Sequence, residues 1–135
     1  MSKSALYAVN TSNQEIAVDG IIAPGTIERK FGPNISLTGN AIQIAGAGYY
    51  EINTSITIVP TTEGEVTVTV YKDGVILQGA TATETAAAAG DSVNLSISAI
   101  VREFCSCCDG LSNLTFVLTG VTSTITNMAI TVEKL

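Results

Sequence analysis

The chain has 135 residues, a length that allows one hydrophobic core without help from a metal or from disulfides. Hydrophobic residues make up 46% of it and charged residues only 13%, so much of the surface must be neutral. Its net charge is −6, and among its basic residues only Arg29 and Lys30 are adjacent, so the basic stripe that nucleic-acid binding needs is excluded.

The amino-terminal residues lack the apolar stretch of a signal peptide, and no apolar run approaches the roughly 18 residues that a membrane helix needs. We therefore expect no signal peptide and no membrane partner. Such a chain would reach the outside of a cell by lysis, as part of a larger particle, or by a route that its sequence does not encode.

The first forty-five residues predict short strands separated by turns that contain glycine or proline. These strands are expected at residues 5–9, 15–18, 27–31, 35–37 and 42–44. A longer strand follows at residues 49–58, where every second side chain from Tyr50 to Ile58 belongs to one buried face.

Residues 66–77 predict a β-hairpin, because Asp73-Gly74 is favoured in a type I′ turn. Residues 79–90 are rich in small side chains and predict a loop. Further strands are expected at 93–102, at 114–118 and through Met128, Ile130 and Val132. Eight to ten strands without significant helix predict an all-β fold, a two-sheet sandwich of jelly-roll type, with residues 1–135 as a single domain.

Four short motifs occur in order along the chain: GYYEI at 48–52, VYKDG at 70–74, GDSV at 90–93 and ITVEKL at 130–135. Together they resemble the tumour-necrosis-factor (TNF) and complement globular-head superfamily over residues 26–135. The likeness is to its bacterial and phage members, found at the tips of collagen-like stalks in spore-coat and virion proteins. No collagen-like register precedes the motifs here, which favours a separate subunit of a larger particle.

The resemblance implies a TNF-like jelly roll of about ten strands that packs as a homotrimer, with inner sheet faces meeting along a three-fold axis. Such domains are trimerising, adhesive or receptor-binding heads without catalysis. If a trimer forms, the candidates for its aromatic core are Tyr49, Tyr50, Tyr71 and Phe116.

The chain has no histidine, which removes the commonest general base and the most usual metal ligand. An enzyme would have to work with carboxylates alone. Glu63 and Glu65 flank Gly64 at an expected turn, and solvated turn carboxylates are the interpretation we prefer to a catalytic pair. No enzymatic activity is expected.

Three thiols, Cys105, Cys107 and Cys108, lie within four positions at the end of an expected strand. Their C-x-C-C spacing differs from common zinc and redox motifs. Three interpretations stay open: a thiol-rich loop with at most one disulfide, disulfides between chains near a symmetry axis, and a metal held by thiolates from several chains.

Asp73, Asp91 and Asp109 stand in expected turns, where aspartate can bind calcium, as in some complement-head relatives, or can accept local backbone hydrogen bonds. The local role is preferred, and no other cofactor is expected.

The sequence thus predicts a non-enzymatic homotrimeric structural or adhesive module of a phage virion or of a bacterial or spore surface. Its partners would be its own copies and other virion or surface proteins. The alternative is a head that binds a glycan or protein receptor through its loops, at residues 79–90 or 60–64.

Overall fold

The computed structural model describes residues 3–103 and 111–135, with the side chain of Leu111 left out. The described residues contain no helix long and apolar enough to span a membrane. They form eleven β-strands. The strands are β1 (Ala5–Asn10), β2 (Gln14–Ile16), β3 (Thr26–Phe31), β4 (Ile35–Thr38), β5 (Ala41–Ala45), β6 (Gly48–Pro60), β7 (Gly64–Lys72), β8 (Val75–Ala86), β9 (Val93–Glu103), β10 (Leu111–Thr119) and β11 (Ser123–Lys134).

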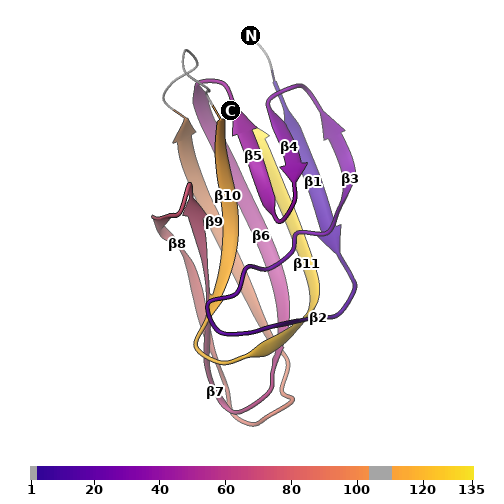
Figure 1. Ribbon diagram of the computed structural model, residues 1–135, viewed down its shortest axis with the longest axis vertical. Coiled ribbons are helices and arrows are strands. Elements are labelled where there is room, and N and C mark those ends of the chain that lie inside the picture. Colours follow the sequence, from indigo (N-terminus) through magenta and orange to yellow (C-terminus); the bar gives the residue numbers. More distant parts are fainter. Residues whose placement is uncertain (1–2, 104–110) are drawn as a thin grey trace.

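The strands form two antiparallel sheets that pack as the layers of a sandwich (Figure 1). The six-stranded sheet has the order β3-β1-β11-β6-β9, with the short β2 paired to one end of β11. The five-stranded sheet has the order β4-β5-β10-β7-β8. Neighbouring strands are often distant in the sequence, since β1 pairs with β11 along its whole length. The all-β, two-sheet sandwich predicted from the sequence is therefore confirmed.

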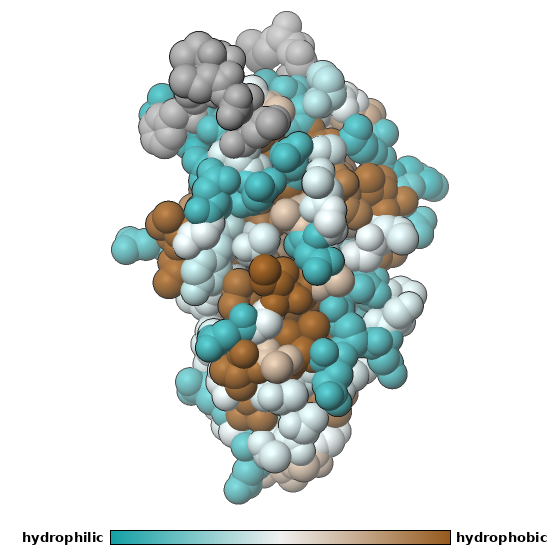
Figure 2. Space-filling view, viewed as in Figure 1, coloured by the Kyte–Doolittle hydropathy of each residue, from teal (hydrophilic) through white to brown (hydrophobic). Residues whose placement is uncertain are grey.

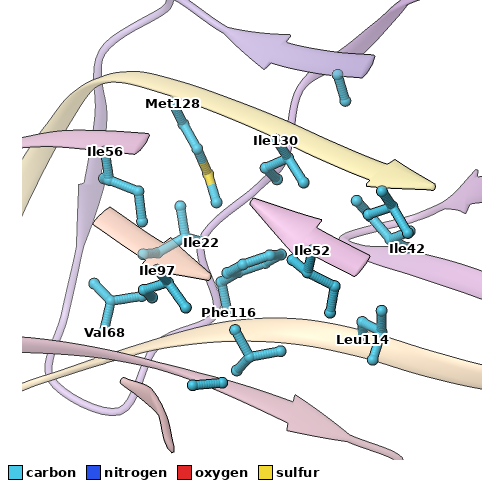
Figure 3. Packing of buried hydrophobic residues seen from close by; sticks show 14 of the residues in the cluster. Ile22, Ile42, Ile52, Ile56, Val68, Ile97, Leu114, Phe116, Met128 and Ile130 are labelled. Carbon is cyan, nitrogen blue, oxygen red and sulfur yellow. The ribbon is translucent and has the colours of Figure 1, made fainter. Parts of the chain in front are cut away.

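The core lies between the sheets and is built from alternate side chains of each long strand. In β6 the side chains of Tyr50, Ile52, Ile56 and Ile58 are fully buried, as the alternation predicts. Figure 3 shows the ring of Phe116 pointing from β10 into the space between the sheets, toward side chains of the opposite sheet. The long strands of both sheets thus meet over one continuous apolar layer.

The hairpin between β7 and β8 turns at Asp73-Gly74, and both residues have positive φ, 52° and 82°. Positive φ at both central residues is the geometry of a type I′ turn, so this prediction is confirmed. A register shift interrupts the ladder between Thr69 and Tyr71. Glycine is suited to this irregular segment, since Gly79 has φ +84°.

The prediction of a loop at residues 79–90 is wrong for its first part, because β8 continues to Ala86. Thr81 and Thr83 point outward and bond the hydroxyl groups of Thr69 and Thr67, at 3.0 and 2.9 Å. The positions between and beside these threonines hold Ala80, which is fully buried, Ala82, the exposed Glu84, and Ala86. Alternation of threonine with alanine has little hydrophobic contrast, so it resembles a small-residue loop in the sequence.

Candidate self-association surface

Shallow hollows lie side by side on the outer face of the six-stranded sheet. The central one has a floor of small side chains, including Ser55 on β6, Ser96 and Ser98 on β9, and Ala129 and Thr131 on β11. These residues occupy the positions that alternate with the buried core residues of the same strands. The strands that build the core therefore also present an outer face with few bulky groups at its centre.

The floor is polar but neutral, and its groups already bond one another. The Ser98 hydroxyl donates to Asn53 Oδ1 at 2.7 Å, and the Thr131 hydroxyl donates to the Asn53 carbonyl at 3.3 Å. Internally satisfied neutral groups cost little free energy to desolvate, whereas unpaired charges cost much. The centre of this face is therefore suited to burial by a partner.

Register places the outward residues of the strands in rows across the sheet. One row contains Phe31 of β3, Ala5 of β1, Glu133 of β11, Glu51 of β6 and Ile100 of β9, each opposite the next. We call these five residues the upper row. Its two ends are apolar and exposed: Phe31 to 63% and Ile100 to 57%.

The next row toward the centre contains Arg29, Tyr7, Thr131, Asn53 and Ser98 in the same strand order. Tyr7 and Phe31, with the stems of Arg29 and Lys30, line a hollow at the β3 edge. Both edges of the face thus have apolar groups, with the neutral floor between them.

The opposite side of the molecule also exposes apolar surface. Figure 2, which looks onto the side of β10 and β5, shows separate hydrophobic areas among pale, neutral ones. Among the exposed apolar residues away from the six-stranded face are Val18, Ile21, Val75 and Ile76. Exposed apolar area alone therefore does not select a binding face.

The four aromatic residues predicted for a trimer core do not lie together. Tyr49 is 50% exposed on the six-stranded face, where the Arg102 guanidinium lies 5.6 Å from its ring centre. Tyr71 is half-buried and faces outward from the other sheet, opposite Thr115 and Ile76. Tyr49 and Tyr71 thus belong to opposite outer faces of the sandwich.

Tyr50 and Phe116 are buried inside the protomer, with no exposed surface. Their assignment to an interface is corrected by this burial, because a side chain enclosed between the sheets has nothing left to present to a second copy. The Tyr50 hydroxyl lies 2.7 Å from the Ala45 carbonyl oxygen and 2.8 Å from that of Gly46, to which it can donate. This residue anchors the turn before β6 to the core.

Burial raises the pKa of the Tyr50 phenol above 10.0, and the nearby Glu103 carboxylate adds to the rise. The folded state therefore holds this proton more tightly than the unfolded state, so its stabilising contribution is present below pH 10 and is lost as the pH rises above it. We expect Tyr50→Phe to cost about 1 to 2 kcal/mol at neutral pH. The difference in melting temperature between wild type and variant should become smaller from pH 9 to pH 11. A difference that stays constant over that range would mean that ionisation of the Tyr50 phenol does not affect stability.

The aspartates proposed for calcium lie apart. Asp73 Oδ1 accepts a hydrogen bond at 2.9 Å from the backbone amide of Asn113 on β10, which is a bond to another strand and not the local one preferred from the sequence. Asp91 precedes β9, which begins at Val93. It lies beside the end of β6, because the amide of the preceding Gly90 donates to the Pro60 carbonyl. These two aspartates lie at opposite ends of the sandwich and cannot share one ion.

The other proposed ligands, Asp109 and the thiols Cys105, Cys107 and Cys108, lie outside the described residues. Within the part of the chain that the structure describes, no three His, Cys, Asp or Glu side chains come together as a metal site would require. The thiol interpretations therefore remain predictions from the sequence.

Sequence reasoning missed Phe31 and Ile100 as surface features. Ile100 belongs to an alternating segment and Phe31 to a less regular one, and neither pattern shows that the two residues end the same row. The signal that could have found them is an apolar residue out of phase with the buried face, as Ile100 is between Ala99 and Val101. Their joint placement follows from strand register alone.

Neither a protein-family model nor a curated protein sequence matches the chain. Among solved structures, the Eiger TNF from S. frugiperda superposes with a TM-score of 0.73 at 9% identity, covering 98% of this chain and 91% of that one. The PRD1 vertex protein P5 gives 0.63 at 18% identity, covering 98% and 96% of the two chains. The globular domain of the zebrafish complement 1qA protein gives 0.64 at 9% identity, covering 97% and 95%.

The architecture is thus that of the jelly-roll β-sandwiches. Its fold is similar to that of TNF-like and complement globular-head structures and of a phage vertex protein, which is the likeness that the sequence motifs predicted. At these identities the likeness is one of fold.

Proposed function

We propose that the chain is a non-enzymatic head that forms a homotrimer through the outer face of its six-stranded sheet. It would serve as a structural or adhesive component of a phage virion or of a bacterial surface. The observation that supports this most is the neutral floor of that face, with apolar groups at both of its edges. The motif resemblance adds the expectation of three-fold packing.

The physical case rests on what a partner would have to remove from water. Around the centre of the face, Ser55, Ser96 and Ala129 are short side chains without charge. Burying them does not require an ion to be desolvated, and their small size lets the backbone of a partner approach closely. The apolar side chains at the edges supply the favourable part of the association free energy.

A single charged, bulky side chain at the centre of the floor tests the location of the interface. Ser55 is exposed and pairs with Ala129 on one side and Ser96 on the other. We expect Ser55→Arg to convert a trimer to monomer in light scattering coupled to size exclusion, because it buries an unpaired charge at the contact. Thermal melts would verify that the variant is folded.

The matched control is Thr85→Arg, which places the same group at an exposed position on the outer face of the five-stranded sheet. This variant should keep the mass of the wild type. A Ser55→Arg protein that stays trimeric, or a Thr85→Arg protein that dissociates, would place the interface elsewhere. Binding to a glycan array by the wild type, lost on changes in the loops and kept in both arginine variants, would support the receptor-head alternative.

A further inference from the structure

We propose that residues 17–23, which we call the strap, cover a strand-addition site on β10, and that the strap opens while the sandwich under it stays folded. The site would accept an extended segment of a partner protein that carries an apolar side chain where the strap carries Ile22. This inference goes beyond the proposed self-association and does not depend on it.

The strap crosses from one sheet to the other. It follows β2, which pairs with β11 in the six-stranded sheet, and it precedes β3, which pairs with β1 in the same sheet. Between these two strands it leaves that sheet and bonds to β10 of the five-stranded sheet (Figure 1). Its hold on the five-stranded sheet therefore depends on the contacts of a few residues.

The strap covers a part of the β10 edge that β5 leaves open. β5 pairs with β10 over residues 111–114. Beyond this point the Asp19 amide donates to the Leu118 carbonyl at 2.7 Å. The Ile22 amide donates to the Phe116 carbonyl at 2.8 Å. Without the strap, these backbone groups of β10 would form a free strand edge, which is the feature that strand addition uses.

One side chain of the strap fills an apolar slot beside this edge. Ile22 has no exposed surface and belongs to the core cluster, so its departure would leave the slot open. Val18 and Ile21, by contrast, are 44% and 45% exposed. In strand addition the backbone bonds supply affinity and such a slot supplies specificity. The strap itself thus shows which kind of segment fits the site.

The two ends of the strap are held differently. At its start the Gly20 amide donates to the Ala17 carbonyl at 2.9 Å, in a turn where the exposed Asp19 has φ +68°. A positive φ is unfavourable for a residue with a side chain. At its end the Gln14 side chain bonds both the amide and the carbonyl of Ala23, each at 3.0 Å. The strap is therefore strained where it begins and fixed where it ends.

Hydrogen exchange of single amides tests the opening. The Leu118 amide donates to the Gly20 carbonyl at 3.0 Å, so the amide of the preceding Val117 points the other way, toward β7. After correction for intrinsic rates, we expect the Leu118 and Ile22 amides to exchange together, at least about tenfold faster than the Val117 amide. A single rate for all three amides would make the strap part of the global fold and overturn the inference.

Two variants of Asp19 change the strap without touching the core. Asp19→Pro removes an amide that bonds β10 and cannot adopt the positive φ, so exchange at Leu118 should become at least about tenfold faster while exchange at Val117 stays the same. Asp19→Gly suits the positive φ and is the matched control, with exchange no faster than in the wild type. Equal acceleration at Leu118 and Val117 in Asp19→Pro would mean that the strap does not open separately.

A synthetic peptide of residues 14–23 tests the site itself. In fluorescence anisotropy the labelled peptide should bind the Asp19→Pro protein, whose strap is open, at least about tenfold more tightly than the Asp19→Gly protein. The same peptide with Ile22→Asp should lose this binding, because the slot is apolar. Equal binding to both proteins, equal binding of both peptides, or no binding at all would overturn the strand-addition site. None of these readouts is the oligomeric mass, so the proposed self-association would stand.

Discussion

Phe116→Ala is expected to lower the free energy of unfolding by about 3 to 5 kcal/mol. Phe116 has no exposed surface and lies between the two sheets, with neighbours from both around its ring (Figure 3). Removing the ring takes away its burial and leaves a cavity whose rigid β walls cannot close. Denaturant unfolding followed by circular dichroism measures the loss.

The size of the loss separates two roles for this side chain. Ile76→Ala changes an exposed residue of the same sheet and should stay within about 0.5 kcal/mol of the wild type. If Phe116→Ala fails to fold, Phe116→Leu should fold with a loss of about 1 to 2 kcal/mol. A loss below about 1 kcal/mol for Phe116→Ala, with a change of oligomeric mass, would return Phe116 to the interface role predicted from the sequence.

Gly120→Ala is expected to cost about 2 to 5 kcal/mol. Gly120 follows β10 with φ +100°, and a Cβ there would lie 2.1 Å from the Glu65 carbonyl oxygen. Both the conformation and the contact oppose a side chain, and the contact is to backbone that cannot rotate away. The turn would have to separate from β7, which disrupts the adjoining ladder between β10 and β7.

The control for this change is Gly79→Ala, where φ is +84° and no atom lies within 4 Å of the added Cβ. That variant carries only the conformational cost, about 1 to 2 kcal/mol. The effect of alanine on the unfolded chain is common to both variants and cancels in their difference. Equal thermal shifts for the two would mean that the close approach at Gly120 is not rigid.

The fold was predictable where hydrophobic contrast along a strand is strong. In β6 apolar and polar side chains alternate so clearly that the buried face could be assigned from the sequence. The dipeptide Asp73-Gly74 likewise predicted the type I′ turn that the structure has there. Where contrast is weak, as in the threonine and alanine run of β8, the strand was taken for a loop. Local pattern thus predicts a strand only as far as its two faces differ.

The candidate site was much less predictable, because its residues are joined by register over long sequence separations. The pairing of Ala5 with Glu133, and of Glu133 with Glu51, brings together three distant segments that no local pattern connects. The assignment of Tyr50 and Phe116 to an interface failed for a different reason. Tyr50 belongs to the alternation that forms the core, and its aromatic character says nothing about which side of a sheet it occupies.

The most direct test of self-association is the solution mass of the unmodified protein, measured by light scattering coupled to size exclusion over a range of concentrations. Parallel runs with a reductant and with a chelator would show whether the thiols or a metal are needed. We expect a mass three times that of the 13.9 kDa chain. A mass of one chain at every concentration would contradict the account and leave the hollowed face without its proposed partner.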